Sequence, residues 1–262
     1  MTLPIPAQIP RTALVTGGAR RLGRAIALAL AEAGFDLAIH FHGSAEAAEE
    51  TAGAIRALGR QAATLRADLA QEAEVRPLVP QAVRALGGRP IGVLVNNASL
   101  FERDEWHDAT RESWDAHLEP NLRAPFVLMQ EFARRLPDGM EGVVVNMIDQ
   151  RVWSLTPHFV SYTVSKAGLW ALTQSMALAL APRIRVNAIG PGPAMASTRQ
   201  TAEQFARQCA SVPLGRGTGP EEIARGVLSI LALPAMTGQM IALDGGQHLQ
   251  WSHAGSGEPL PE

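Results

Sequence analysis

Short apolar runs alternate with stretches of helical periodicity along almost the whole chain, and this alternation limits the fold more than any other feature. Short apolar runs predict buried strands, whereas apolar residues three and four positions apart predict amphipathic helices. Strands are expected at residues 12–16, 36–41, 62–66, 91–96, 142–148, 185–189 and 239–243. Helices are expected at residues 22–33, 44–58 (capped by Ser44), 72–86, 121–135, from just before Tyr162 to about residue 181, and 220–233.

Repeated units of strand, helix and strand build a parallel sheet with right-handed crossovers. The run Val143-Val144-Val145 is apolar on both faces, as a strand covered by helices on each side must be. We therefore expect an α/β fold with a Rossmann-like, doubly wound, parallel seven-stranded sheet. With 262 residues, 47% of them hydrophobic, the chain can bury a large core as a single domain, 1–262, with irregular tails at 1–10 and 251–262.

Three irregular segments, residues 100–113, 150–159 and 191–201, follow the carboxyl ends of predicted strands. In an open α/β sheet, ligands bind at that edge. These segments are therefore the expected walls of a ligand site.

Charge and composition exclude several classes of partner. A net charge of −2, with arginines scattered among acids, provides no basic field for nucleic acid. The single cysteine, Cys209, excludes an internal disulfide and fits a reducing compartment. The chain lacks both a charged start followed by an apolar run and an apolar stretch of about 18 residues, so we expect neither a signal peptide nor a membrane span. The prediction is a cytoplasmic protein that acts on a small molecule, without a metal.

Tyr162 is the only tyrosine of the chain and Lys166 the only lysine, and they lie four residues apart in a predicted helix. That spacing places both side chains on one helix face, where the ammonium group is expected to lower the pKa of Tyr162 from about 10. A compact ammonium can hold ribose hydroxyls and a proton relay, whereas a planar guanidinium cannot. The alternative is a surface tyrosine beside a solvated lysine, which is disfavoured in a chain that otherwise contains neither residue.

The turn after the first predicted strand reads Thr16-Gly17-Gly18-Ala19-Arg20-Arg21-Leu22-Gly23. Its glycines let the backbone approach a pyrophosphate, and the following helix supplies N–H donors and a positive dipole. The pattern also fits a tight structural turn, but its place between the first strand and the first helix favours a dinucleotide cofactor.

Together these motifs resemble those of the short-chain dehydrogenase/reductase family over almost the whole chain. Further motifs of that family follow in order: Asn96-Asn97-Ala98 with Ser99 for its glycine, Asn121 at its catalytic asparagine, Pro191-Gly192 after the sixth strand, and Asp244-Gly245-Gly246 after the seventh. The resemblance implies a Rossmann fold, a nicotinamide cofactor and a homotetramer built partly on the helices that begin near Asn121 and Tyr162.

Three departures from the family resemble the pteridine reductases and dihydromonapterin reductases. Arg21 stands where the family's turn has its middle glycine, and Asp149 stands in place of the catalytic serine. The second strand ends His40-Phe41-His42-Gly43-Ser44, similar to the signature of those reductases, although Gly43 replaces an arginine that would contact a phosphate.

Each departure has a chemical meaning. A carboxylate repels a ketone oxygen, whereas a serine donates a hydrogen bond to it. Asp149 therefore suits a substrate with N–H donors, or, when protonated, it can give a proton to a ring nitrogen during C=N reduction. Arg21 would point toward cofactor phosphates and substrate. Phe101 matches the phenylalanine with which pteridine reductases hold a pterin against the nicotinamide, since flat heterocycles stack well. The alternatives are a carboxylate that caps the next turn, a solvated arginine and an exposed loop phenylalanine.

The resemblance implies NADPH as the cofactor. The second strand ends without the acidic residue that binds the ribose 2′-hydroxyl of NAD, because Asp36 lies at its other end. Arg20, His40, His42 and Ser44 could bind a 2′-phosphate instead. The expected cofactor site comprises Gly17, Arg20, Arg21, Leu22, Gly23, His40, Phe41, His42, Ser44, Asp68, Leu69, Asn97, Ala98, Ser99, Tyr162, Lys166, Pro191 and Gly192.

The resemblance further implies a reductase that transfers hydride from NADPH to a pterin, converting a dihydropterin to a tetrahydropterin. The implied catalytic residues are Asp149, Tyr162, Lys166 and Asn121, the last supporting a water relay to the lysine, and the implied substrate site comprises Arg21, Ser99, Phe101, Asp149 and Tyr162. Two alternatives remain open. The first is an NADPH-dependent carbonyl reductase of the 3-oxoacyl or sugar type, which Asp149 disfavours. The second is a non-catalytic nucleotide-sensing Rossmann protein, which the intact tyrosine, lysine and asparagine disfavour.

Overall fold

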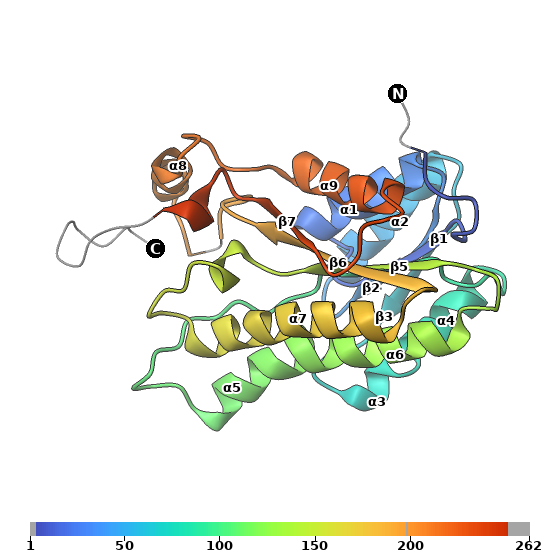
Figure 1. Ribbon diagram of the computed structural model, residues 1–262, viewed down its shortest axis with the longest axis horizontal. Coiled ribbons are helices and arrows are strands. Elements are labelled where there is room, and N and C mark those ends of the chain that lie inside the picture. The colour runs from blue at the N-terminus through green and yellow to red at the C-terminus, as the bar shows by residue number, and fades with distance from the viewer. Residues whose placement is uncertain (1–3, 198, 251–262) are drawn as a thin grey trace.

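A single parallel sheet of seven strands forms the centre of the structure, a computed structural model that describes residues 4–197 and 199–250 (Figure 1). Its strands are β1 (Thr12–Val15), β2 (Asp36–Phe41), β3 (Ala62–Arg66), β4 (Val93–Asn96), β5 (Gly142–Met147), β6 (Ile184–Pro191) and β7 (Met240–Leu243). They lie in the order β3-β2-β1-β4-β5-β6-β7, and every neighbouring pair is parallel. The order reverses direction between β1 and β4, so the predicted doubly wound sheet is confirmed, with its switch point at β1.

Helices cover both faces of this sheet, as Figure 1 shows. On one face lie α1 (Arg21–Glu32), α2 (Ala45–Ala57) and α9 (Pro220–Ala232). On the other lie α3 (Glu72–Val75), α4 (Leu78–Ala85), α6 (Ala124–Arg135) and α7 (Val160–Ala179). The side chains of β5 alternate between these layers, because Val143 and Val145 pack with the first set of helices and Val144 with the second. This alternation explains why the strand is apolar at every position.

The predicted helix at residues 72–86 is wrong in one respect, because it is interrupted between α3 and α4. Pro77 lies at the break, immediately before α4. Proline lacks the N–H that a continuous helix needs and clashes with the preceding turn, so the chain restarts the helix there. Ser44 does precede α2 as expected, but its side chain makes no capping hydrogen bond.

Among the described residues, two α-helices lie outside the predicted set: α5 (Arg111–Leu118) and α8 (Ala202–Ser211). The helix predicted from residue 121 begins earlier, with a π-helical turn at Glu119–Arg123 that joins α5 to α6. Such wide turns are rare and often occur at functional sites. Here the turn carries Asn121.

The two predicted tails differ in how much of each the structure describes. Residues 4–10 form no strand or helix, yet Ile9 is 1% exposed and belongs to the core. The predicted tail at 251–262 lies outside the described residues, as do residues 1–3. Within the described part of the chain, no helix has the length and apolar character needed to span a membrane.

Candidate functional site

The carboxyl ends of the central strands bring together most of the residues singled out above. Tyr162 and Lys166 lie in the first two turns of α7, and Asp149 follows β5 after a gap of one residue. The glycine turn follows β1, Asn97 follows β4 and Pro191 ends β6. Residues far apart in the chain thus converge because parallel strands all end at one edge.

Asp149 and Tyr162 form a direct hydrogen bond: the phenol donates to Oδ2 of the carboxylate at 2.9 Å. The other carboxylate oxygen, Oδ1, accepts the backbone N–H of Arg151 at 2.8 Å and caps the short 3-10 turn Gln150–Val152. The capping alternative is therefore correct, yet it uses only one oxygen. The second oxygen remains directed at the phenol.

The pKa of Tyr162 is raised well above its usual value of 10.0, first by burial, then by the charge of Asp149 and their hydrogen bond. The expected lowering by Lys166 is wrong for this structure, and the geometry gives the reason. The ammonium lies 5.8 Å from the centre of the phenol ring, over its face, and donates to the carbonyl of Met147 at 2.8 Å. Its charge acts on the ring rather than on the hydroxyl group.

Lys166 is itself strongly buried, with 2% of its surface exposed. Burial lowers its pKa from 10.5 to about 8, although the negative charge of Asp149 opposes this shift. The ammonium is therefore poised to lose its proton only slightly above neutral pH.

Asn121 is fully buried in the π-helical turn and joins two walls of the site. Its amide donates to the carbonyl of Leu100 at 2.9 Å and to Oγ of Ser165 at 3.1 Å, and it accepts the N–H of Leu100 at 2.9 Å. Ser165 in turn donates to the carbonyl of Tyr162 at 2.7 Å. Asn121 thereby fixes the segment after β4 against the helix of the tyrosine and the lysine.

The turn after β1 requires glycine at two positions. Gly17 has φ +61°, a left-handed conformation that favours glycine, and a Cβ on Gly23 would lie 2.1 Å from the Gly17 carbonyl oxygen. Asn97 holds this turn to the end of β4, donating from its side chain to the carbonyls of Thr16 and Gly17 at 2.9 and 3.2 Å. Glycine is therefore required at Gly17 and Gly23 by the packing of the turn on itself and on the end of β4.

His40 lies beneath this turn, and its ring is 2% exposed. Nδ1 accepts the N–H of Gly17 at 3.1 Å, and Nε2 lies 3.1 Å from the carbonyl of Ala67. Burial is the main cause that lowers its pKa from 6.5 to about 4, so the ring is neutral at pH 7. Because both nitrogens are occupied, the expected contact of His40 with a phosphate is corrected to an indirect one: the ring shapes the turn.

Other expected phosphate ligands remain at the surface. The side chain of Arg20, at the start of α1, has no hydrogen bond or ion pair within the described residues and is exposed. His42 has a side chain that is 60% exposed and lies 3.4 Å from Asp68. Phe41 is half-buried and Leu69 buried, next to these groups in sequence.

Arg21 keeps the left-handed conformation, with φ +52°, although it replaces a glycine of the related turn. Such a conformation costs a non-glycine residue roughly 1–2 kcal/mol. Its guanidinium donates to the carbonyls of Ala196 and Met195 at 3.0 and 3.4 Å. Arg21 therefore ties the glycine turn to the segment that follows β6.

Phe101 lies beside Tyr162, as expected, within a cluster of aromatic and arginine side chains. Its ring stacks on Phe159, with centroids 4.5 Å apart and planes 12° apart, and contacts Tyr162 edge-on at 4.6 Å. Arg199 covers the ring with its guanidinium carbon 5.2 Å from the centroid. Ser99, in contrast, is exposed, and its hydroxyl group donates to the neighbouring carbonyl of Leu100 at 3.2 Å.

A buried polar network that the sequence did not reveal supports the start of α7. Asp104 accepts the backbone N–H of Ser161 at 3.1 Å and its hydroxyl group at 2.5 Å. His117 lies 2.7 Å from the same hydroxyl through Nδ1, and its Nε2 accepts the N–H of Glu102 at 3.0 Å. The three side chains come from a loop, from an unpredicted helix and from α7, so no sequence spacing could connect them.

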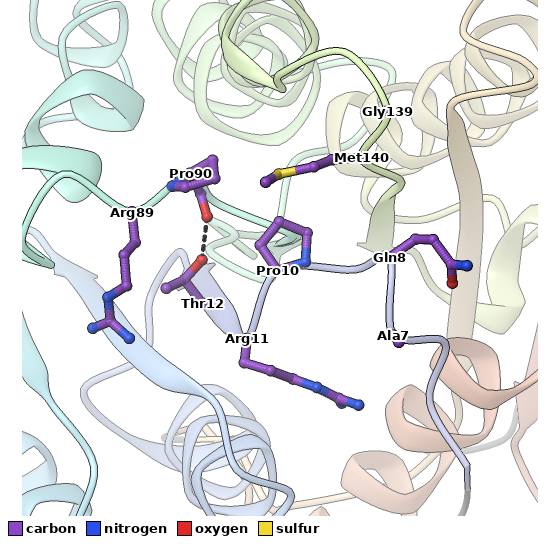
Figure 2. Close-up of a pocket in the computed structure, with 9 residues that line it drawn as sticks. All are labelled: Ala7, Gln8, Pro10, Arg11, Thr12, Arg89, Pro90, Gly139 and Met140. Atoms are coloured by element: carbon purple, nitrogen blue, oxygen red, sulfur yellow. Dashed lines mark hydrogen bonds between the residues drawn. The ribbon is translucent and has the colours of Figure 1, made fainter.

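The depression shown in Figure 2, with a volume of about 390 Å³, lies at the opposite edge of the sheet. Its walls lie before β4 and β5 and before or at the first residue of β1: Ala7, Gln8, Pro10, Arg11, Thr12, Arg89, Pro90, Gly139 and Met140. It is therefore separate from the candidate site. No cluster of His, Cys, Asp or Glu suitable for a metal occurs in the part of the chain that the structure describes.

A family model described as short chain dehydrogenase matches residues 11–207. Among curated proteins, a 3-oxoacyl-[acyl-carrier-protein] reductase FabG from Staphylococcus aureus is 31% identical over 247 residues, which cover 92% of this chain and 100% of that protein.

Two solved structures are more similar in sequence. A FolM alternative dihydrofolate reductase 1 from Brucella canis, complexed with NADP, is 46% identical with a TM-score of 0.91, covering 96% of this chain and 100% of that one. The corresponding protein from Brucella suis, also in complex with NADP, is 47% identical with a TM-score of 0.89, covering 97% and 98%.

Proposed function

Because this chain belongs to the short-chain dehydrogenase family, it is an oxidoreductase, and we propose that it reduces a pterin with NADPH, converting a dihydropterin to a tetrahydropterin. The two FolM structures support this proposal through the activity for which the proteins are named, their bound NADP and their similarity over nearly the whole chain.

The observation that carries the proposal is the hydrogen bond between Asp149 and Tyr162. A ketone reductase needs two donors at the carbonyl oxygen, and a carboxylate in place of the serine would repel that oxygen. A pterin presents ring N–H and amino groups, for which a carboxylate is a good acceptor. The pair therefore suits reduction of a C=N bond in a nitrogen heterocycle.

Tyr162 and Asp149 are the side chains that can donate a proton in the proposed reduction. The raised pKa of Tyr162 keeps its hydroxyl group protonated, so the phenol is a donor that Asp149 orients. When Asp149 binds a proton instead, it can donate that proton to a ring nitrogen. Bound NADPH supplies the hydride. We propose that Lys166 holds its ribose and that Asn121 supports a water relay to the lysine.

The glycine turn suits the cofactor's pyrophosphate because it joins β1 to the amino terminus of α1, where free N–H groups and the helix dipole favour a phosphate. The end of β2 carries Phe41 and His42 and has no carboxylate that would repel a 2′-phosphate. The exposed guanidinium of Arg20 and the exposed imidazole of His42 lie there instead, which favours NADPH over NADH. A clear experiment is the ratio of kcat/KM for the two cofactors, and equal values would refute the assignment.

For the substrate we propose a place between Phe101 and the nicotinamide, with Asp149 and Arg21 along one edge of the ring. Stacking on Phe101 should contribute about 1–3 kcal/mol, the range for bases on aromatic side chains. Phe101→Ala should raise KM for a pterin accordingly without a matching fall in kcat.

Reduction of a 3-oxoacyl thioester is the second candidate, favoured by the 31% identity to the Staphylococcus aureus reductase. The same Asp149 that suits a pterin argues against it. We also propose a cytoplasmic homotetramer packed through α6 and α7, for which the exposed Val164 and Leu178 on α7 offer apolar surface.

A substrate panel tests the function directly. NADPH oxidation should be fastest with dihydrobiopterin, dihydromonapterin or dihydrofolate, and slow or absent with acetoacetyl thioesters and simple ketones. Turnover of the thioester without turnover of any pterin would replace the proposal by the second candidate. Complete inactivity on the panel with intact NADPH binding would favour a nucleotide sensor.

A further inference from the structure

An exposed ion pair covers Phe101 at the mouth of the candidate site. Arg199 contacts Glu102 through Nη1 at 2.6 Å, and its Nη2 donates to the carbonyl of Phe101 at 2.7 Å. The two side chains are 40% and 62% exposed. One guanidinium thus binds the carboxylate and the backbone of the segment after β4 while covering the aromatic ring.

This arrangement leaves no face of the Phe101 ring free for a flat substrate. Phe159 stacks on one face at 4.5 Å, so the guanidinium of Arg199, over the ring at 5.2 Å, takes the other. A ligand that stacks on Phe101 must displace one of them. Phe159 is 6% exposed and immediately precedes α7, whereas Arg199 lies in an irregular surface segment. Arg199 is therefore the side chain that such a ligand would displace.

The cost of releasing Arg199 from Glu102 is small, because exposed ion pairs contribute little to stability. A neighbouring arginine is held differently. Arg103 pairs at 2.7 Å with Glu105, whose side chain is only 14% exposed and also contacts His158. Of the two arginine pairs, the one with Glu102 is the easier for an incoming carboxylate to replace, and the guanidinium offers that carboxylate two parallel donors.

Resting on the proposed function, we propose that Arg199 recognises a carboxylate on the substituent of the pterin. The site then prefers a pterin with an acidic tail, such as dihydrofolate, over one with a neutral tail, such as dihydrobiopterin. The acidic tail restores to Arg199 the ion pair that it gives up with Glu102, whereas a neutral tail leaves the displaced guanidinium with water alone.

The test compares kcat and KM of the full-length enzyme for dihydrofolate and dihydrobiopterin, which share the reacting ring. Arg199→Gln should lower the ratio of kcat/KM for dihydrofolate to kcat/KM for dihydrobiopterin about tenfold, the size expected for one charge-assisted contact of roughly 1.4 kcal/mol. The loss should lie in KM, because Arg199 does not touch the reacting atoms. For dihydrobiopterin the same variant should be unchanged or slightly faster, since the ring of Phe101 is uncovered.

Two further variants sharpen the comparison. Glu102→Gln removes the competing carboxylate and should raise kcat/KM for both substrates alike, since both displace Arg199 from the same ion pair. Arg111→Gln removes a charge of the same sign from an exposed arginine that pairs with Asp115 on α5, and it should change neither substrate. In the wild type, added salt should raise KM for dihydrofolate alone, and Arg199→Gln should abolish that dependence.

An unchanged ratio between the two substrates in Arg199→Gln, with both still turned over, would overturn this inference and leave the proposed function intact. An equal loss on both substrates would likewise show that Arg199 only shapes the site. If the wild-type enzyme reduces neither pterin, the inference fails together with the proposed function.

Discussion

Replacement of Asp104 should destabilise the protein and impair the tyrosine without touching any ligand. Asp104 is 4% exposed, and it accepts the backbone N–H and the hydroxyl group of Ser161, the residue before Tyr162. The residue at the cap position of α7, Phe159, is left-handed and offers no capping side chain. A carboxylate from a distant loop therefore does what the local sequence cannot, since the first N–H groups of a helix need acceptors.

The magnitude follows from the groups that Asp104→Ala would leave without partners. Loss of a helix cap costs about 1 kcal/mol, and a buried donor without an acceptor costs about 1–3 kcal/mol more, so we expect about 3 kcal/mol in total. For a protein of this size that corresponds to a fall in Tm of about 6–12 °C. Asp104→Asn keeps one acceptor oxygen for the Ser161 N–H and should cost about half as much.

Thermal unfolding followed by circular dichroism measures the stability, and kcat with saturating cofactor and pterin measures the position of Tyr162. Asp108 is a matched control: it accepts a backbone N–H in the same loop at 2.7 Å but is exposed, so Asp108→Ala should shift Tm by little. An Asp104→Ala variant that melts within about 2 °C of the wild type, and therefore costs at most about 1 kcal/mol, with unchanged kcat would refute the capping argument.

Four further predictions concern the catalytic and cofactor residues. Tyr162→Phe should abolish hydride transfer yet leave NADPH affinity, measured by fluorescence titration, nearly unchanged; a near-normal rate would end the proposed mechanism. Because the pKa of Lys166 is lowered to about 8, kcat/KM should fall as pH rises above about 8. The stability should rise between pH 8 and 10.5, because there the unfolded state binds a proton that the folded state has lost; pH profiles of kcat/KM and stability that are flat in this range contradict the prediction. His40 has a pKa of about 4 in the folded state and 6.5 as a free side chain, so the protein should lose about 3 kcal/mol of stability as pH falls from 6.5 to about 4. The variant His40→Phe should lose this pH dependence, and it should also bind NADPH more weakly because the N–H of Gly17 loses its acceptor. Asp149→Ser should damage pterin turnover and raise weak carbonyl reduction, and undiminished pterin turnover would show that the carboxylate is dispensable.

The sequence by itself determined the architecture and the chemistry of the central residues. Strand and helix periods are local properties of the chain, so the alternation predicted the parallel sheet and the position of nearly every strand. The sole tyrosine and lysine, four residues apart, indicated the family, and Asp149, Arg21 and the end of β2 indicated the reductases that the solved relatives support. Pro77 also indicated, from the sequence alone, a break in the helix, which the prediction of one long helix at 72–86 did not take into account.

Only the tertiary structure decided how those residues act on one another. The pKa of Tyr162 depends on its burial and on a carboxylate from another element, so a spacing that favoured Lys166 gave the wrong direction. From its position at the end of β2, His40 was predicted as a phosphate ligand, whereas in the structure its ring lies between the N–H of Gly17 and the carbonyl of Ala67. Asp104 and Arg199 carry no signal in a single sequence, because each acts on residues more than fifty positions away. Distances through space and exclusion of water set these interactions, and both arise only when the chain has folded.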